Sequence, residues 1–229
     1  MSNFRKGKKE MKSLITLFFA TVILVSNANA GIIFETGTGP FDSTVCCGSS
    51  IAKDQFIGTT FSLTGKTKID AIGGHFRNFG GSSGSIFGAI VELDQFGLPT
   101  GTLTGLSNVL AHTTFNPLNS ANTFASVDVD LEAGVYGLIF GSGLFGANGH
   151  SALTLIQPYQ VSNPKGEVLA LNTSSLLTWD SSVSSQGRYR MFVSGTSSNV
   201  SEPNSLVLLL LSSALFFVVR RKRKSIFDF

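Results

Sequence analysis

The sequence predicts an all-β fold: an antiparallel two-sheet sandwich that is jelly-roll-like. Three observations predict it. No stretch between residues 31 and 198 keeps a convincing helical period. Short β-rich runs recur there between Gly, Ser, Thr, Asn and Pro, and residues 124–131 alternate between apolar and polar side chains. Two apolar segments flank this region, and we expect an N-terminal signal helix and a C-terminal transmembrane helix from them.

The expected strands are runs rich in β-branched and aromatic residues. They are residues 56–63, 68–76, 85–93, 106–115, 124–131, 135–140, 152–159, 167–171 and 188–194. The Gly-Leu-Pro-Thr-Gly sequence at 97–101 predicts a turn between two of them. The main structural rival, a parallel β-helix, needs a short fixed-period repeat, and the sequence has none.

Phenylalanine accounts for 20 of the 24 aromatic residues. Many fall at strand positions, where burial of each ring is worth roughly 1.5–3 kcal/mol. The expected core rings are Phe61, Phe76, Phe87, Phe115, Phe140 and Phe192. An aromatic platform for a glycan is the alternative, but such platforms favour Trp and Tyr for their polar groups. The composition therefore favours a Phe-rich core.

Residues 1–30 have the pattern of a secretory signal peptide. Five Lys/Arg precede a 12-residue apolar run at 14–25, and Ala28 and Ala30 form a small-x-small site before Gly31. The run is about 18 Å long as a helix, too short to span a bilayer core of about 30 Å. Cleavage after Ala30 is expected; an uncleaved anchor is the alternative, and Met11 is a second candidate start.

The other end has three parts in a fixed order. A linker at 197–204 carries the motif Ser201-Glu202-Pro203, followed by an apolar segment at 205–219. A basic tail at 220–229 begins with the cluster Arg220, Arg221, Lys222, Arg223 and Lys224. An apolar helix ended by a basic cluster is a stop-transfer element with its basic end in the cytoplasm. The alternatives are a permanent single-pass anchor and a tail that is removed after sorting.

These residues resemble the PEP-CTERM sorting tail of Gram-negative bacterial proteins. Glu202 and Pro203 match the Pro-Glu-Pro triplet, whereas Ser201 stands in place of its first proline. The resemblance implies recognition by exosortase, a membrane-embedded cysteine transpeptidase. It also implies transient residence in the inner membrane, then release or attachment at the cell surface among exopolysaccharide.

The predicted ectodomain comprises residues 31–196. Within it, residues 69–76, 85–91 and 131–145 resemble the β-rich domains found before such tails. This second resemblance supports the architecture and the cellular setting only.

The net charge of +3 comes from the two ends of the chain. Between residues 31 and 198 there are 7 Lys/Arg and 11 Asp/Glu, so the middle region is mildly acidic. A nucleic-acid-binding domain would cluster its basic residues on a folded face. The charge distribution therefore excludes nucleic acid as a partner of this domain.

No residue is assigned a catalytic or metal-binding role. His75, His112 and His150 have no spacing typical of zinc sites, and no strand-to-helix turn of the nucleophile-elbow type is predicted. The alternating carboxylates at 92/94 and at 128/130/132 fit a solvated strand face better than a glycosidase pair, whose carboxyl groups in retaining enzymes lie about 5–5.5 Å apart. No cofactor is expected; Ca²⁺ at these acidic positions is the alternative that stays open.

Cys46 and Cys47 are the only cysteines, and they are adjacent. Neighbouring Cα atoms are about 3.8 Å apart, whereas an ordinary disulfide spans about 4.4–6.8 Å. A strained vicinal disulfide, an intermolecular disulfide and two free thiols therefore remain open, since an exported protein meets an oxidising compartment.

Together these features predict a non-enzymatic structural protein of the cell surface or extracellular matrix, associated with exopolysaccharide and sorted by exosortase. A surface module that binds a glycan or ice is the first alternative, and a surface hydrolase is a weaker one.

Overall fold

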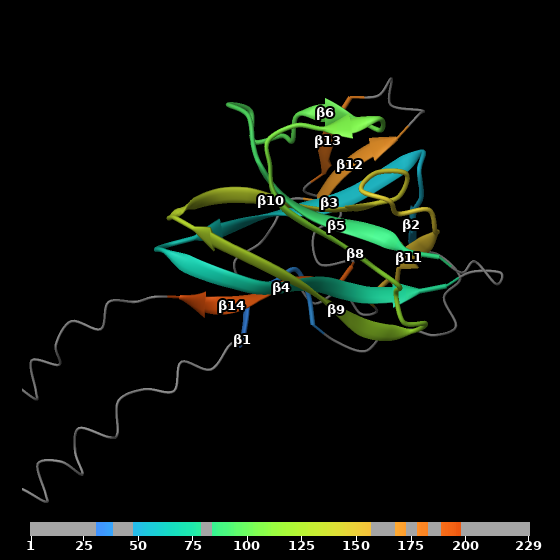
Figure 1. Ribbon diagram of the computed structural model, residues 1–229, viewed down its shortest axis with the longest axis horizontal. Coiled ribbons are helices and arrows are strands. Elements are labelled where there is room, and N and C mark those ends of the chain that lie inside the picture. Colours follow the sequence, from blue (N-terminus) through green and yellow to red (C-terminus); the bar gives the residue numbers. More distant parts are fainter. Residues whose placement is uncertain are drawn as a thin grey trace, which may run out of the picture. The chain divides into compact units, whose positions relative to one another are not determined.

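The computed structural model describes residues 31–38, 48–78, 84–156, 168–172, 178–182 and 189–197. Within these ranges the chain forms strands and turns and no α-helix. The prediction of an all-β fold with antiparallel sheets in a sandwich-like arrangement is confirmed (Figure 1). The signal peptide, the sorting tail and the helices expected from them lie outside the described residues.

The first sheet is built around the long central strand β4. It contains β1 (Gly31–Glu35), β14 (Met191–Ser197), β4 (Thr67–Arg77), β9 (Ala121–Leu131), β11 (Ser151–Leu153) and β2 (Ser49–Ile51). Strand β4 pairs antiparallel with β9, β14 and β11. Its neighbours therefore hold the residues of this sheet in a defined register, which positions the candidate site described below.

The second sheet packs against the first. Its order is β13 (Asp180–Ser182), β12 (Val168–Asn172), β3 (Gln55–Leu63), β10 (Gly134–Gly141), β5 (Ile86–Glu92) and β8 (Val109–Phe115). A separate small hairpin is formed by β6 (Gly101–Thr102) and β7 (Gly105–Leu106). Every pairing found in these ladders is antiparallel, as the alternating pattern predicted.

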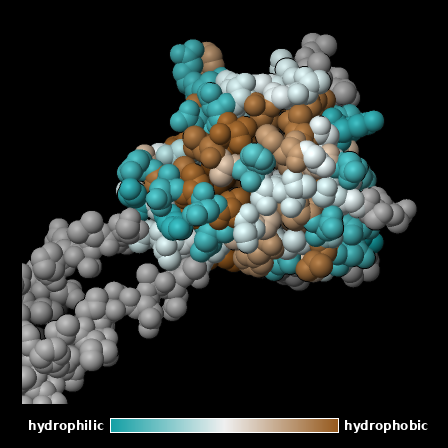
Figure 2. Space-filling view, viewed as in Figure 1, coloured by the Kyte–Doolittle hydropathy of each residue, from teal (hydrophilic) through white to brown (hydrophobic). Residues whose placement is uncertain are grey.

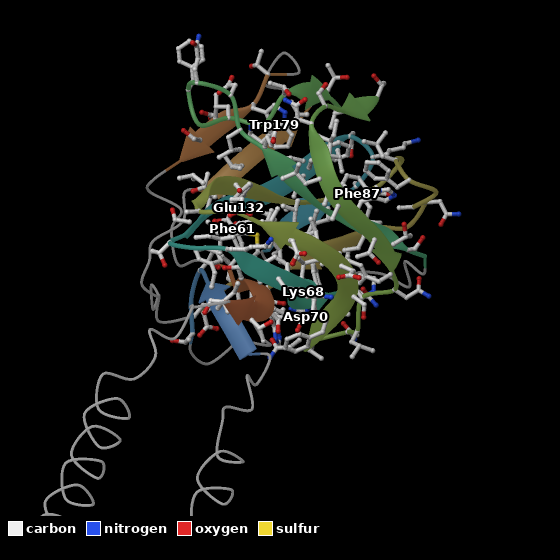
Figure 3. All side chains as sticks on the ribbon, turned by 60° about the vertical axis from the view of Figure 1, so that its left-hand side comes forward. Phe61, Lys68, Asp70, Phe87, Glu132 and Trp179 are labelled. Atoms are coloured by element: carbon white, nitrogen blue, oxygen red, sulfur yellow. The ribbon has the colours of Figure 1, made fainter. Side chains whose placement is uncertain are left out.

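The main core lies between the two sheets. The rings of Phe76 and Phe140 meet edge to face with centroids 5.2 Å apart, and both side chains are fully buried. Phe61 lies in the same core, between the sheets (Figure 3), and Phe115 packs against it while partly buried. The core prediction is therefore confirmed for these rings. Phe87 is buried in a second cluster, and Phe192 is buried against Phe124 on the outer face of the first sheet.

A second apolar cluster covers the other face of the second sheet. Neighbours along a strand divide between the two clusters, with Ile57 in the main core and Phe56 in the second, and likewise Phe140 and Ile139. Successive side chains of a strand point to opposite faces, so this sheet is apolar on both. Leu98, Leu103 and Leu106 from the segment around β6 and β7 pack on the outer cluster, as do other apolar side chains. Apolar residues gather on this side between β6 and β10 (Figure 2).

Several strands differ from the prediction. The predicted run 106–115 is divided into β7 and β8, and Asn108 between them has a left-handed φ of 54°. In the described part of the run 152–159, which ends at residue 156, the only strand is β11, and the described part of the run 188–194 lies at the start of β14. The short strands β1, β2 and β13 and the hairpin were not predicted, because two- to five-residue strands carry little periodicity. The turn after β5 is centred on residues 95 and 96, with the Gly97 backbone nitrogen donating to the Asp94 carbonyl oxygen, so it lies N-terminal to the predicted 97–101; Gly97 has a φ of 77°.

The first and last described strands are neighbours. Strand β1 pairs antiparallel with β14 (Figure 1), and the register places Gly31 opposite Gly195. The residue that would follow signal cleavage therefore lies beside the strand that leads to the predicted sorting motif. Among the described residues, no helix is long and apolar enough to cross a membrane.

Candidate functional site

Three strands of the first sheet place a compact set of side chains on its outer face. Core residues such as Ile72 and Val193 alternate with these positions, so the set points away from the main core. The register aligns it in three rows across β14, β4 and β9. We call the set the outer-face platform: Arg190, His75 and Asn122; then Phe192, Gly73 and Phe124; then Ser194, Ala71 and Ser126.

The centre of the platform is a pair of aromatic rings. Phe192 and Phe124 are both register partners of Gly73, on opposite sides of it. Their ring centroids are 4.3 Å apart with the planes 40° to each other. Phe192 is fully buried, whereas Phe124 is 53% exposed. Glycine allows this arrangement, because a Cβ at position 73 would lie 2.6 Å from Cε2 of Phe192.

One flank of the platform holds charged and polar groups whose charge is largely balanced. Nε and Nη2 of Arg190 each lie 3.0 Å from Oε2 of Glu35, and its guanidinium carbon is 5.7 Å from the centroid of Phe192. Nδ1 of His75 lies 3.0 Å from Oδ1 of Asn122. Burial, aided by the nearby Arg190 charge and opposed by the Asn122 contact, lowers the pKa of His75. The imidazole is therefore neutral at pH 7.

The carboxylates beside the platform are paired with lysines. Asp128 lies 3.0 Å from the Lys68 ammonium, and Glu132 lies 3.7 Å from that of Lys66. All four side chains are more than half exposed. Lys68 and Glu132 are labelled in Figure 3. The hydrogen bond to Asp128 and then its charge raise the pKa of Lys68. These carboxylates occupy a solvated strand face.

The remaining candidate carboxylates lie at the end of β5. Glu92 is exposed. Oδ1 of Asp94 accepts hydrogen bonds from the backbone nitrogens of Phe96 at 2.8 Å and Leu98 at 2.9 Å. An aspartate used in this way closes its own turn, so the geometry assigns Asp94 a structural role.

A pocket of about 540 Å³ lies among the loops at 52–54 and 142–150. Lys53, Asp54, Asn148 and His150 supply polar groups to it. Nε2 of His150 lies 2.9 Å from Oγ of Ser50, a distance that suits a nucleophile and its general base. No carboxylate within the described ranges hydrogen-bonds His150, so this pair has no orienting third member there.

The three histidines have separate environments. His75 lies on the platform, His150 lines the pocket, and His112 stacks on Phe145 with ring centroids 4.1 Å apart. In the part of the chain that the structure describes, no three His, Cys, Asp or Glu side chains gather as a metal site would require.

Most of the sequence-predicted site residues lie outside the described ranges. These are Ala28 and Ala30 of the cleavage site, Cys46 and Cys47, Ser201, Glu202 and Pro203, and Arg220, Arg221, Lys222, Arg223 and Lys224. Gly31 is described and begins β1.

The platform was not predicted, and part of its signal was present in the sequence. Phe124 falls in the polar phase of its strand, with Ser126 and Asp128, so alternation alone places it on the wet face. Phe192 could not be separated from core phenylalanines, because its contact with Phe124, which is 68 residues away in sequence, cannot be read from its own strand.

Comparison with models of protein families found no match, and comparison with curated proteins found none.

Proposed function

We propose that this chain is an exported structural protein of the cell surface or extracellular matrix of a Gram-negative bacterium. Its precursor crosses the inner membrane, is held there by its C-terminal segment, and is processed by an exosortase that recognises Ser201, Glu202 and Pro203. The working part is the β domain, which we propose is jelly-roll-like and acts without catalysis or a cofactor.

The single observation that carries this proposal is the three-part tail. A short motif, an apolar segment at 205–219 and the basic cluster from Arg220 to Lys224 follow one another in the order that a sorted, membrane-held precursor needs. The basic n-region and the Ala-x-Ala site at the other end supply the export signal.

The pairing of β1 with β14 supports the same topology. Because Gly31 lies opposite Gly195, the chain enters and leaves the domain at one end of the same sheet. This arrangement suits a precursor with both terminal segments in one membrane and the folded domain on one side of it.

Intact mass spectrometry of the protein from its host tests the proposal. In the wild type, we expect a chain that begins at Gly31 and ends near Pro203, and in an exosortase-null strain a chain that retains its tail. Glu202→Ala should also retain the tail, whereas the matched change Ser205→Ala should be processed normally. Full-length tails in every strain would overturn processing and leave a permanent anchor.

A glycan-binding module is the second candidate function, and the outer-face platform favours it over ice binding. Ice-binding faces rely on regular hydroxyl arrays, whereas the platform combines one exposed ring with the amide of Asn122 and the hydroxyl of Ser126. A surface hydrolase is the third candidate, for which the pair Ser50 and His150 offers the only nucleophile and base at hydrogen-bond distance among the described residues.

A further inference from the structure

We propose that the outer-face platform binds a neutral polysaccharide, with a pyranose ring stacked on Phe124. The proposal assigns a ligand class and a binding site to the matrix role proposed above. It rests on that role, because a protein located in the matrix meets polysaccharide there. The binding itself is a property of the folded domain and is testable without any processing step.

The exposed ring is held in place before any ligand arrives. Phe124 is 53% exposed and rests on Phe192, which is buried beneath it. The position of Gly73 between them, without a side chain, lets the rings meet across the central strand. A ring that is already fixed loses little conformational freedom on binding, and this favours affinity.

Small residues keep the surface around the ring flat. Gly73 and Ala71 occupy the central strand, and Ser126 and Ser194 are the partners of Ala71 on either side. A linear polysaccharide needs such a surface, because its pyranose rings present flat C–H faces that pack on an aromatic ring. On β14, β4 and β9 no side chain of this third row is bulkier than serine, and Ile32 of β1, which is 40% exposed, is the next partner beyond Ser194.

Polar groups lie on both sides of the ring along the strands. Asn122 and His75 stand two residues from Phe124 and Gly73 in one direction, and Ser126 and Ala71 stand two residues away in the other. Two residues of a strand span about 6.6–7 Å. A sugar ring on Phe124 therefore has its equatorial hydroxyls directed toward an amide on one side and a serine hydroxyl on the other.

The charge of the platform selects a neutral chain over an anionic one. The positive charge of Arg190 is engaged by Glu35, and His75 is neutral at pH 7. Farther along β9, Asp128 and Asp130 are exposed, with Lys68 as the partner of Asp128. Within the platform the one permanent cation is Arg190, which Glu35 already engages, and an anionic polysaccharide would be repelled by Asp130 farther along β9.

Affinity electrophoresis of the full-length protein in a nonionic detergent tests the inference. Native gels would contain one of four neutral polysaccharides (hydroxyethylcellulose, xyloglucan, galactomannan or dextran), or anionic alginate. Phe124→Ala removes the stacking ring, and Phe124→Trp keeps one. Phe96→Ala is the matched control, because Phe96 is 77% exposed and lies on the turn after β5, outside the platform.

We expect at least one neutral polysaccharide to retard the wild type, and Phe124→Ala to weaken its association constant at least tenfold, or about 1.4 kcal/mol. Phe96→Ala should match the wild type, and Phe124→Trp should retain binding. Retardation by none of the four, retardation by alginate alone, or equal binding by Phe124→Ala and Phe96→Ala would each overturn the inference.

Size-exclusion chromatography supplies the remaining outcome. A dimer that Phe124→Ala dissociates would show that a second copy of the chain covers the platform, and this would also overturn the inference. Failure of the sorting proposal is distinguishable, because a protein with an uncleaved tail in every strain could still be retarded in the gels.

Discussion

Replacing Gly73 by alanine tests whether the close approach of β14, β4 and β9 shapes the platform. A Cβ at this position would lie 2.0 Å from the carbonyl oxygen of Thr123 and 2.6 Å from Cε2 of Phe192. Neither neighbour can move at a low energetic cost, because the first is backbone of β9 and the second is a ring that packs against Phe124. Overpacking usually costs about 1–3 kcal/mol. We expect Gly73→Ala to lower the free energy of unfolding by about 3 kcal/mol, at the upper end of that range.

The same chemical change at Gly65 is the control. No atom lies within 4 Å of a Cβ there, so we expect Gly65→Ala to change the free energy of unfolding by less than about 1 kcal/mol. Trp179 is the single tryptophan and is buried, so its fluorescence reports unfolding in urea. With a slope of about 2 kcal/mol per M, Gly73→Ala should lower the urea midpoint by about 1.5 M. Equal midpoints for the two variants would refute the close-approach reasoning.

Three further predictions concern the core, a histidine and a turn. Phe140→Ala should cost about 3–5 kcal/mol in the same urea titrations, whereas Phe96→Ala should stay within about 0.5 kcal/mol. His75 has a lowered pKa in the folded state, so the unfolded chain binds more protons below the ordinary value of 6.5. Stability should therefore fall as the pH drops through this region, and His75→Gln should flatten that dependence. Asp94→Ala should speed hydrogen exchange at the amide of Leu98, because the carboxylate accepts its hydrogen bond.

The alternating pattern predicted β9 well because that strand has one dry and one wet face. Val127 and Val129 pack against the core, while Ser126, Asp128 and Asp130 are exposed. The same reasoning could not recognise that the second sheet is apolar on both faces. In β10, Ile139 and Phe140 are consecutive and enter different clusters, so the strand has no polar phase to reveal what covers it.

The candidate site depends on information that single strands do not contain. Gly73 joins the two rings only because Phe192 and Phe124 are its register partners on opposite sides. Strands β4 and β14 are separated by more than 110 residues in sequence, so which strands meet, and in which register, is a matter of tertiary packing. Sequence alternation can place a phenylalanine on the wet face, but it cannot place a second one beneath it.

The acidic excess of the central region can be counted from the sequence, but which of its charges are paired depends on the tertiary structure. Of its basic residues, Lys66, Lys68 and Arg190 each pair with a carboxylate on or beside the outer face of the first sheet. Pairing cancels charge locally, while the excess of four acidic residues between 31 and 198 persists over the domain as a whole. Long-range repulsion of a polyanion is therefore strongest at low ionic strength and weakens as salt screens it. Binding of a neutral polysaccharide through Phe124 should be insensitive to salt, and this separates ring stacking from electrostatic capture on the same face.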